Sequence, residues 1–249
     1  MTAEQKPLAH RIALVTGASR GIGYATALAL AKAGAHVVAV ARTVGGLEEL
    51  DDAIKAVGSS ATLVPLDLKD YEGIARLAVA LHQRFGRLDV LVGNAGILGS
   101  LSPLGHVEAK TWDDVMAINV TANWRLIAAM DPLLKFSDAG RVVFISSGVT
   151  ALALAYWGPY AASKAALETL ARTYAAETAT TNVRVNVFTP GPVRTRMRAQ
   201  AMPGEDPLTL VTPDQVAAKI VELCLPSMQE SGKIYSYQKG AFLQFRPPA

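Results

Sequence analysis

The chain has 249 residues, of which 51% are apolar and 18% are charged, a composition that fills a large core and excludes a disordered chain. The formal net charge is only +3 and Lys and Arg form no run, so we expect no nucleic-acid partner. No uninterrupted apolar run approaches the roughly 18 residues that cross a bilayer, so we expect no membrane insertion.

The first ten residues, MTAEQKPLAH, are polar and lack the apolar stretch of a secretory signal. We expect residues 1–9 to form an irregular tail. The single cysteine, Cys224, excludes an internal disulfide. Both observations favour a cytoplasmic protein.

Short apolar runs then alternate with longer amphipathic ones along the whole chain. Most of the short runs are continuous, as in parallel strands that are covered on both faces. The strand candidates are Arg11–Thr16, His36–Ala41, Ala61–Leu66, Val90–Gly93, Arg141–Ser146, Val183–Phe188 and Lys233–Tyr237. The helix candidates are 21–33, 45–57, 70–85, 111–135, 159–179 and 213–225. This alternation predicts an α/β fold: one doubly wound, Rossmann-type parallel sheet of about seven strands with helices on both faces. We expect residues 1–249 to form a single dinucleotide-binding and catalytic domain.

A glycine-rich segment, Thr16–Gly23, lies directly between the first strand and the first helix. Its spacing is Gly-x3-Gly-x-Gly. Glycines permit a tight turn and let the backbone approach a diphosphate, whose charge is stabilised at a helix N-terminus. An ordinary turn between a strand and a helix is the alternative, and the position of the motif favours dinucleotide binding.

The end of the second strand indicates which dinucleotide is bound. Sites for NAD usually place an acidic residue there to bind the ribose hydroxyls. This chain instead reads Val40-Ala41-Arg42-Thr43. Because Arg42, and Arg20 in the glycine-rich loop, can pair with a 2′-phosphate, the sequence predicts NADP(H). Two ordinary surface arginines are the alternative.

The stretch Trp112–Leu134 carries apolar residues on nearly every face. A helix of this kind needs cover on both sides, and the sheet can cover only one. We therefore predict self-association, as a homodimer or a homotetramer; long loops over this helix are the alternative.

Tyr160 and Lys164 are four residues apart at the start of a predicted helix, so they share one face. A nearby ammonium favours the phenolate, which we expect to draw the Tyr160 pKa down toward working pH. A tyrosine of this kind can act as general acid or base on a carbonyl or an alcohol. Ser147 follows the fifth strand, at the edge where open α/β sheets bind ligands, and its hydroxyl can hold the substrate oxygen.

These elements together resemble the short-chain dehydrogenase/reductase family over roughly residues 8–238. The motifs that carry the resemblance are Thr-Gly-x3-Gly-x-Gly at 16–23, Asn-Ala-Gly at 94–96, the helix residue Asn119, Ser147, Tyr160-x3-Lys164 and Pro190-Gly191. Their order and spacing, rather than any single motif, point to the family. The stretch Met202–Pro207 resembles a poorly characterised bacterial subgroup of it.

The resemblance implies a catalytic set of Asn119, Ser147, Tyr160 and Lys164, and no metal. Tyr160 would protonate the carbonyl oxygen, which Ser147 orients, while Lys164 binds the nicotinamide ribose and passes protons toward a water on the Asn119 backbone. Asp67 would meet the adenine and Thr195 the nicotinamide amide. The implied cofactor-binding set is Gly17, Ser19, Arg20, Gly21, Ile22, Gly23, Arg42, Asp67, Leu68, Asn94, Ala95, Gly96, Tyr160, Lys164, Pro190, Gly191, Val193 and Thr195.

Substrate specificity should come from Gly148–Pro159, Ile97–Leu104 and the segment after Pro190, with residues 192–212 forming a lid over the site. Arg194, Arg196 and Arg198 are either an anion-binding cluster or solvated side chains on that lid. Two departures from the family are Gly93, where many relatives have Asn, and the absence of the glycine-rich C-terminal part that is usual in 3-oxoacyl carrier-protein reductases.

The sequence therefore predicts an NADP(H)-dependent oxidoreductase that moves a hydride between the cofactor and a small-molecule carbonyl or alcohol. Two alternatives stay open. The first is a 3-oxoacyl thioester reductase, acting on a carrier-protein or coenzyme A thioester. The second is an NADPH-binding regulatory protein without turnover, against which the complete Ser-Tyr-Lys-Asn set argues.

Overall fold

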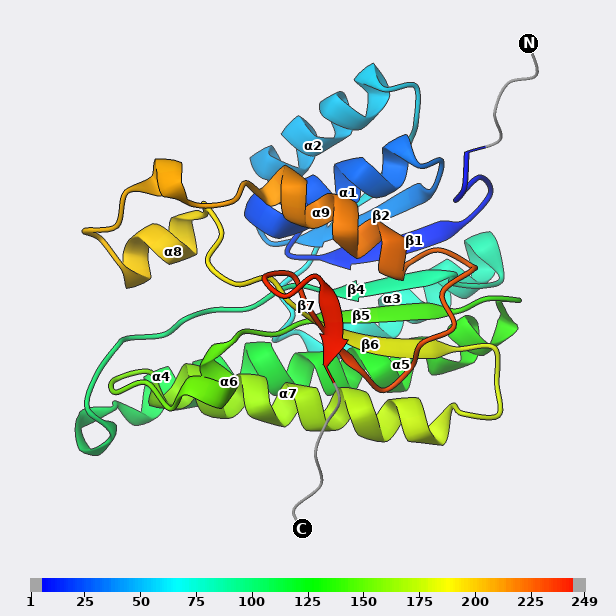
Figure 1. The fold of residues 1–249 in the computed structure, drawn as a ribbon. Coiled ribbons are helices and arrows are strands. Elements are labelled where there is room, and N and C mark those ends of the chain that lie inside the picture. Colours follow the sequence, from blue (N-terminus) through cyan, green and yellow to red (C-terminus); the bar gives the residue numbers. More distant parts are fainter. Residues whose placement is uncertain (1–5, 244–249) are drawn as a thin grey trace.

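A single sheet runs through the part of the chain that the computed structural model describes, residues 6–243 (Figure 1). Its strand order is β3-β2-β1-β4-β5-β6-β7-β8. The strands are β1 (Ile12–Thr16), β2 (His36–Ala41), β3 (Ala61–Pro65), β4 (Val90–Gly93), β5 (Arg141–Ile145), β6 (Arg184–Thr189), β7 (Ile234–Ser236) and β8 (Ala241–Leu243). The first seven pair in parallel, and β8 is antiparallel to β7.

Apolar residues hold this register. Leu14 of β1 lies between Val38 of β2 and Leu91 of β4, and all three side chains are fully buried. Strands covered on both faces read as continuous apolar runs, which is why the sequence predicts them. The doubly wound parallel sheet is confirmed. The eighth strand was not predicted, because β8 is only three residues long and is joined to β7 by a turn that ends at Gly240.

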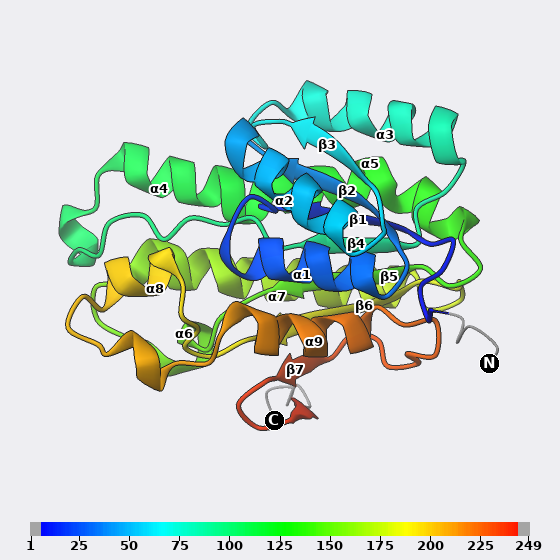
Figure 2. The same ribbon diagram turned by 90° about the horizontal axis from the view of Figure 1, so that it is seen from above.

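Helices cover both faces of the sheet (Figure 2). On one face α1, α2 and α9 pack against β1 residues Ala13 and Val15, and on the other α3, α5 and α7 pack around Leu14. The helices are α1 (Gly21–Lys32), α2 (Val44–Ala56), α3 (Tyr71–Phe85), α4 (Ala109–Met116), α5 (Ala122–Phe136), α6 (Val149–Leu152), α7 (Gly158–Glu177), α8 (Arg196–Ala201) and α9 (Pro213–Leu223), with single turns η1 (Leu104–His106) and η3 (Pro207–Thr209). No helix among the described residues combines the length and the apolar character needed to span a membrane.

The helix expected over 111–135 is interrupted. A π-helical turn, η2 (Ala117–Thr121), separates α4 from α5, and such turns are frequent at functional sites. On the inner side Val115, Leu126 and Met130 are fully buried. On the outer side Trp112 is 39% exposed and Trp124 is 46% exposed, so the described part of one chain leaves them partly uncovered.

Residues 1–5 of the predicted N-terminal tail lie outside the described part of the chain. The end of that tail belongs to the core, because Leu8 is fully buried and its backbone N–H donates to the Ala33 carbonyl at 2.9 Å.

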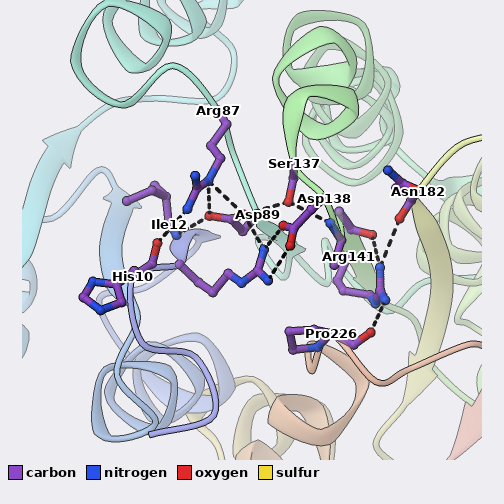
Figure 3. Close-up of polar contacts among 12 residues, drawn as sticks. His10, Ile12, Arg87, Asp89, Ser137, Asp138, Arg141, Asn182 and Pro226 are labelled. Carbon is purple, nitrogen blue, oxygen red and sulfur yellow. Dashed lines mark hydrogen bonds and ion pairs between the residues drawn. The ribbon is translucent and has the colours of Figure 1, made fainter. Parts of the chain in front are cut away.

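A buried carboxylate ties together the amino-terminal ends of β1 and β4, away from the ligand-binding edge (Figure 3). Asp89 is 1% exposed and accepts hydrogen bonds from the Ile12 backbone N–H at 2.8 Å and the Ser137 hydroxyl at 2.6 Å. Arg11 and Arg87 pair with the same carboxylate at 3.0 and 3.2 Å. A buried charge persists only when it is paired and hydrogen-bonded, as Asp89 is.

Candidate active site

The loop after β1 forms a cradle at the start of α1. Gly17 and Gly21 have φ angles of 64° and 57°, in the left-handed region that glycine adopts without strain. A Cβ at Gly23 would lie 2.3 Å from the Gly17 carbonyl oxygen, so the helix can approach the loop only with glycine there. No side chain caps α1 at Arg20, which leaves first-turn N–H groups for an anionic ligand.

Thr16 and Asn94 brace this cradle from β1 and β4. The Thr16 hydroxyl accepts from the backbone N–H groups of Asn94 and Ala95 at 3.1 and 3.0 Å. The Asn94 amide donates to the backbone carbonyls of Thr16 and Gly17 at 2.9 and 3.3 Å. Asn94 therefore joins two strand ends as well as lining the cavity, and Thr16, the first residue of the glycine motif, is a contributor that the predicted cofactor-binding set leaves out.

The ribose end of the cavity carries the two basic residues expected there. Arg20 and Arg42 both line it, and Arg42 is exposed. The Arg42 guanidinium lies 3.8 Å from the carboxylate of Asp67, the residue assigned to the adenine. This exposed, long pair holds Arg42 weakly, so the guanidinium can turn to a phosphate.

The proposed catalytic side chains meet at the carboxyl ends of β4 and β5. Helix α7 presents Tyr160 and Lys164 on one face, 8% and 3% exposed, and Ser147 follows β5. The Lys164 ammonium donates to the Ile145 backbone carbonyl at 2.7 Å and lies 5.7 Å from the centre of the Tyr160 ring. Gly96 lies beside Asn119 and Lys164: a Cβ at residue 96 would lie 3.2 Å from Asn119 Oδ1, a tight approach, and 3.4 Å from the ammonium nitrogen, an ordinary contact.

Burial dominates the ionisation of both groups. It raises the pKa of Tyr160 to about 12, although hydrogen bonding with Ser147 opposes the rise. It lowers the pKa of Lys164 to about 8, against the opposing effect of the Glu168 carboxylate. The expectation that the Tyr160 pKa is drawn down toward working pH is therefore wrong for the cofactor-free protein, because loss of solvent outweighs the hydrogen bond with Ser147.

Asn119 lies on the π-helical turn, and its side chain is fully occupied. Its Oδ1 accepts from the Ile97 N–H at 2.8 Å, and its Nδ2 donates to the Ile97 carbonyl and the Ser163 hydroxyl, both at 2.9 Å. Its backbone carbonyl accepts from the Asn123 amide at 2.9 Å. The side chain thus clamps the segment after β4, and the water relay at the backbone carbonyl stays a prediction.

These elements enclose a cavity of about 830 Å³. Most of the predicted site residues line it. They are Gly17, Ser19, Arg20, Gly21, Ile22, Arg42, Asp67, Leu68, Asn94, Ala95, Gly96, Ser147, Tyr160, Lys164, Pro190, Gly191, Val193 and Thr195. Gly23 and Asn119 do not line the cavity and stand one layer behind it, where they support the residues that do.

The substrate side of the cavity is mainly apolar. Trp157 contacts the Tyr160 ring edge-on, with the ring centres 6.0 Å apart, and Val149 and Leu98 pack in the same cluster. Leu152, Leu154 and Met197 also line the cavity. The cavity wall includes residues from all three predicted specificity segments, with Met197 from the segment after Pro190, whereas Gln238 lies outside them.

The arginine cluster after β6 is divided. Arg194 does not line the cavity, whereas Arg196 and Arg198 do. Arg198 is paired through two nitrogens with the Glu205 carboxylate, at 2.5 and 2.6 Å. The three arginines therefore differ in position: Arg194 lies away from the cavity, and Arg198 at the cavity is engaged by Glu205.

Comparison with known proteins agrees with this geometry. The model of the short chain dehydrogenase family matches residues 11–206, which contain the glycine cradle, Asn94, Ser147, Tyr160 and Lys164. The chain belongs to the short-chain dehydrogenase family. This confirms the predicted family and the predicted class of enzyme, an oxidoreductase.

Among curated members of the family, the uncharacterized oxidoreductase YciK of Escherichia coli K12 is 39% identical over 245 residues, which cover 95% of each chain. The 3-oxoacyl-[acyl-carrier-protein] reductase FabG of Pseudomonas aeruginosa is 34% identical over 221 residues, 86% of this chain and 89% of FabG. Among solved structures, a short chain dehydrogenase from Shigella flexneri 2a complexed with NADP superposes with a TM-score of 0.90 at 39% identity, covering 94% of this chain and 100% of that one.

Proposed function

We propose that this short-chain dehydrogenase is an NADP(H)-dependent carbonyl reductase. The observation that carries the proposal is the meeting of Ser147, Tyr160 and Lys164 in the same cavity as a glycine cradle flanked by Arg20 and Arg42. One end of this cavity suits the cofactor and the other suits the reacting carbonyl.

The residues present fit NADP(H). Side chains on Gly17 or Gly23 would force the loop apart, since a Cβ at Gly17 would lie 2.9 Å from the Asn94 amide and 3.0 Å from the Ala95 Cα. Arg20 and Arg42 offer positive charge for a 2′-phosphate, and the end of β2 carries no acid. The similar Shigella flexneri structure is complexed with NADP, which supports this cofactor.

When bound, the nicotinamide would supply or accept the hydride. The chain itself positions the carbonyl and handles the proton. Ser147 holds the substrate oxygen, Tyr160 donates a proton to that oxygen, and Lys164 provides the positive charge that stabilises the phenolate left behind.

The burial of Tyr160 leaves the phenol in the protonated form that reduction of a carbonyl requires. With a pKa of about 12, the phenol is protonated at neutral pH and is ready to act as an acid. Oxidation of an alcohol needs the phenolate instead, and the cofactor-free site disfavours that form.

We infer that the substrate is a small molecule with apolar groups beside its carbonyl. The wall made by Leu98, Val149, Leu152 and Trp157 offers no charge. Arg198 is already engaged by Glu205, so of the arginines after β6 only Arg196 lines this cavity without an ion pair among the described residues.

Residues 192–212 are proposed as a lid within one domain that spans residues 1–249. This segment contains α8 and η3, and the side chains of Met202 and Leu208 are 41% and 76% exposed. Apolar residues left exposed beside an apolar cavity would gain cover when the segment closes over a substrate.

We also infer that copies of the chain associate through the outer side of α4 and α5. Trp112 and Trp124 are the exposed indoles on this surface. Sedimentation equilibrium should show a dimer or a tetramer for the native chain and a smaller species for Trp124→Glu. An unchanged native monomer contradicts this inference.

The test of the reductase is NADPH consumption across a panel of aromatic and alicyclic ketones, aldehydes, quinones and 3-oxoacyl thioesters. Turnover should appear with apolar carbonyls and fall by at least about a hundredfold in Tyr160→Phe, with cofactor affinity retained. Arg42→Asp should weaken NADPH far more than NADH, and equal losses for both would contradict the 2′-phosphate assignment.

A 3-oxoacyl thioester reductase is the second candidate, favoured by the similarity to FabG and by Arg196 at the cavity. Turnover confined to thioesters, and lost in Arg196→Ala, would select it. Tight NADPH binding with no turnover of any carbonyl would instead support a regulatory binder.

A further inference from the structure

Glu168 stands behind the active site on α7. It follows Tyr160 and Lys164 at successive steps of four residues, so the three side chains lie along one side of the helix. Unlike Tyr160 and Lys164, Glu168 does not line the cavity. Its carboxylate is therefore not a substrate or cofactor contact, and its role must lie in what it holds.

The Glu168 carboxylate accepts hydrogen bonds from residues on both sides of Ser147. Its Oε1 accepts from the Ser146 hydroxyl at 2.6 Å and from the Thr150 hydroxyl at 3.1 Å. Ser146 directly follows β5, and Thr150 lies in α6. One oxygen atom thus ties α7, which carries Tyr160, to the turn that carries Ser147.

Two other hydrogen bonds join this region to α7: the Ser147 side chain bonds with Tyr160, and the Lys164 ammonium donates to the Ile145 carbonyl. The Thr150 hydroxyl lies 3.2 Å from the Ser147 carbonyl, and the Val149 N–H lies 3.5 Å from the Ser147 hydroxyl, which is a long hydrogen bond. Beyond α6 the backbone is strained, because Ala153 and Tyr156 have φ angles of 46° and 75°. The Glu168 carboxylate adds to these contacts and holds the turn against α7 on both sides of Ser147.

Charge gives Glu168 a second role. The charged groups that act on its carboxylate are Lys164 and Arg172, both on α7, whereas β5 and α6 contribute the hydroxyls of Ser146 and Thr150. Burial raises the pKa of Glu168, and these partners oppose the rise. The carboxylate in turn raises the pKa of Lys164 against the effect of burial.

We propose that Glu168 is a positioning residue for the reaction, which holds Ser147 in register with Tyr160 and keeps the Lys164 ammonium charged. An apolar residue would fill the same space without the unfavourable desolvation of a carboxylate, so packing alone does not account for Glu168. This role rests on the proposed reductase function.

Two substitutions separate the two effects. Glu168→Gln keeps an oxygen that can accept from Ser146 and Thr150 but removes the charge, and Glu168→Leu removes both. Glu177→Gln is the matched control, since Glu177 is an exposed carboxylate on the same helix. Each variant is checked for folding by circular dichroism and for NADPH affinity, which should stay within about twofold of the native value because Glu168 does not contact the cavity.

For carbonyl reduction, we expect Glu168→Leu to lower kcat by about a hundredfold, the typical result of misplacing a catalytic group by about an ångström. Glu168→Gln should retain most of kcat at low pH but lose activity at a lower pH than the native enzyme does, because Lys164 gives up its proton earlier. The Ser146→Ala, Thr150→Val double variant should reproduce the fall in kcat without moving the pH profile.

A measurement without turnover keeps this inference separate from the proposed function. The NMR shift of the Lys164 side-chain carbon beside the ammonium, assigned by its loss in Lys164→Arg, can be titrated in the native protein and in Glu168→Gln. We expect the midpoint to fall in Glu168→Gln and to stay in place in Glu177→Gln. A folded Glu168→Gln with an unchanged midpoint would overturn the proposal, whether or not any carbonyl in the panel is reduced.

Discussion

The amide of Asn123 occupies the space that a side chain at position 93 would fill. A Cβ at Gly93, the last residue of β4, would lie 2.7 Å from the Asn123 Oδ1 and 2.4 Å from the Phe144 ring. Asn123 also donates to the Asn119 carbonyl at 2.9 Å. The departure from the family at Gly93 is therefore matched by a side chain from α5 that reaches under the π-helical turn.

Gly93→Ala should consequently lower the free energy of unfolding by about 1–3 kcal/mol, the usual effect of overpacking a core. Urea unfolding of Gly93→Ala, Asn123→Ala and the double variant measures the coupling between the two positions. We expect the double variant to be more stable than the sum of the single losses, since Asn123→Ala relieves one of the two clashes. Strict additivity would show that Phe144 alone sets the limit at this position.

The pH dependence of reduction should report Lys164. Since burial lowers its pKa from 10.5 to about 8, kcat/KM should fall above about pH 8 as the ammonium loses its proton. Tyr160 stays protonated to about pH 12 and does not cause this limb. A fall in kcat/KM that begins only above pH 10 would contradict the assignment to Lys164.

The same shift of the Lys164 pKa has a consequence for stability. Between about pH 8 and 10.5 the folded chain has released a proton that the unfolded chain still holds. The contribution of Lys164 to the free energy of unfolding therefore rises with pH in that window. Thermal unfolding of the native protein against Lys164→Met, compared across these pH values, measures it.

The sequence identified the parts of the site that are formed by residues close together in the chain. The spacing of Tyr160 and Lys164 on one helical face and the glycines between β1 and α1 need no tertiary information, and both lie where they were expected. Glu168 follows at the same spacing of four, so a signal for it existed in the sequence. Its partners Ser146 and Thr150 become visible only when β5 and α6 are placed against α7.

Other features depend on desolvation or on distant packing. The direction of the Tyr160 shift could not be read from the sequence, because the neighbouring lysine was visible and the burial was not. The π-helical turn at Asn119 left no break in the apolar pattern of the helix. In the sequence Arg198 belongs to a cluster of three arginines. Nothing in the neighbouring residues indicates that it pairs with Glu205.

Among acidic residues outside the active site, replacement of the buried Asp89 should lower the free energy of unfolding the most. Asp89→Ala leaves Arg87 and the Ile12 N–H without this acceptor, and loss of one partner in a buried pair typically costs about 3–5 kcal/mol (Figure 3). Asp138→Ala is the control, because Asp138 pairs with Arg11 while its side chain is 75% exposed, and it should cost less than about 1 kcal/mol. If both variants lose the same free energy of unfolding in urea, burial does not increase the contribution of Asp89 to stability.

The pair between Arg198 and Glu205 should govern how well the proposed lid is ordered. It joins α8 to the turn before η3, and the two side chains are 22% and 28% exposed. Arg198 lowers the pKa of Glu205 below its ordinary value of 4.5, so the pair is complete at neutral pH and is lost only as the pH falls through that lowered value. Glu205→Gln should therefore raise KM for the carbonyl substrate by up to about fivefold while leaving kcat nearly unchanged, because the reacting groups lie on other elements.

The reversed pair, Arg198→Glu with Glu205→Arg, is the control that separates the ion pair from the individual side chains. If the pair orders the lid, the reversal should recover most of the native KM, whereas Arg198→Glu alone should be at least as impaired as Glu205→Gln because it places two carboxylates together. Failure of the reversal to improve on Arg198→Glu would mean that Arg198 acts on the substrate or cofactor directly. In that case the arginines after β6 would regain the role in anion binding that the pairing with Glu205 argues against.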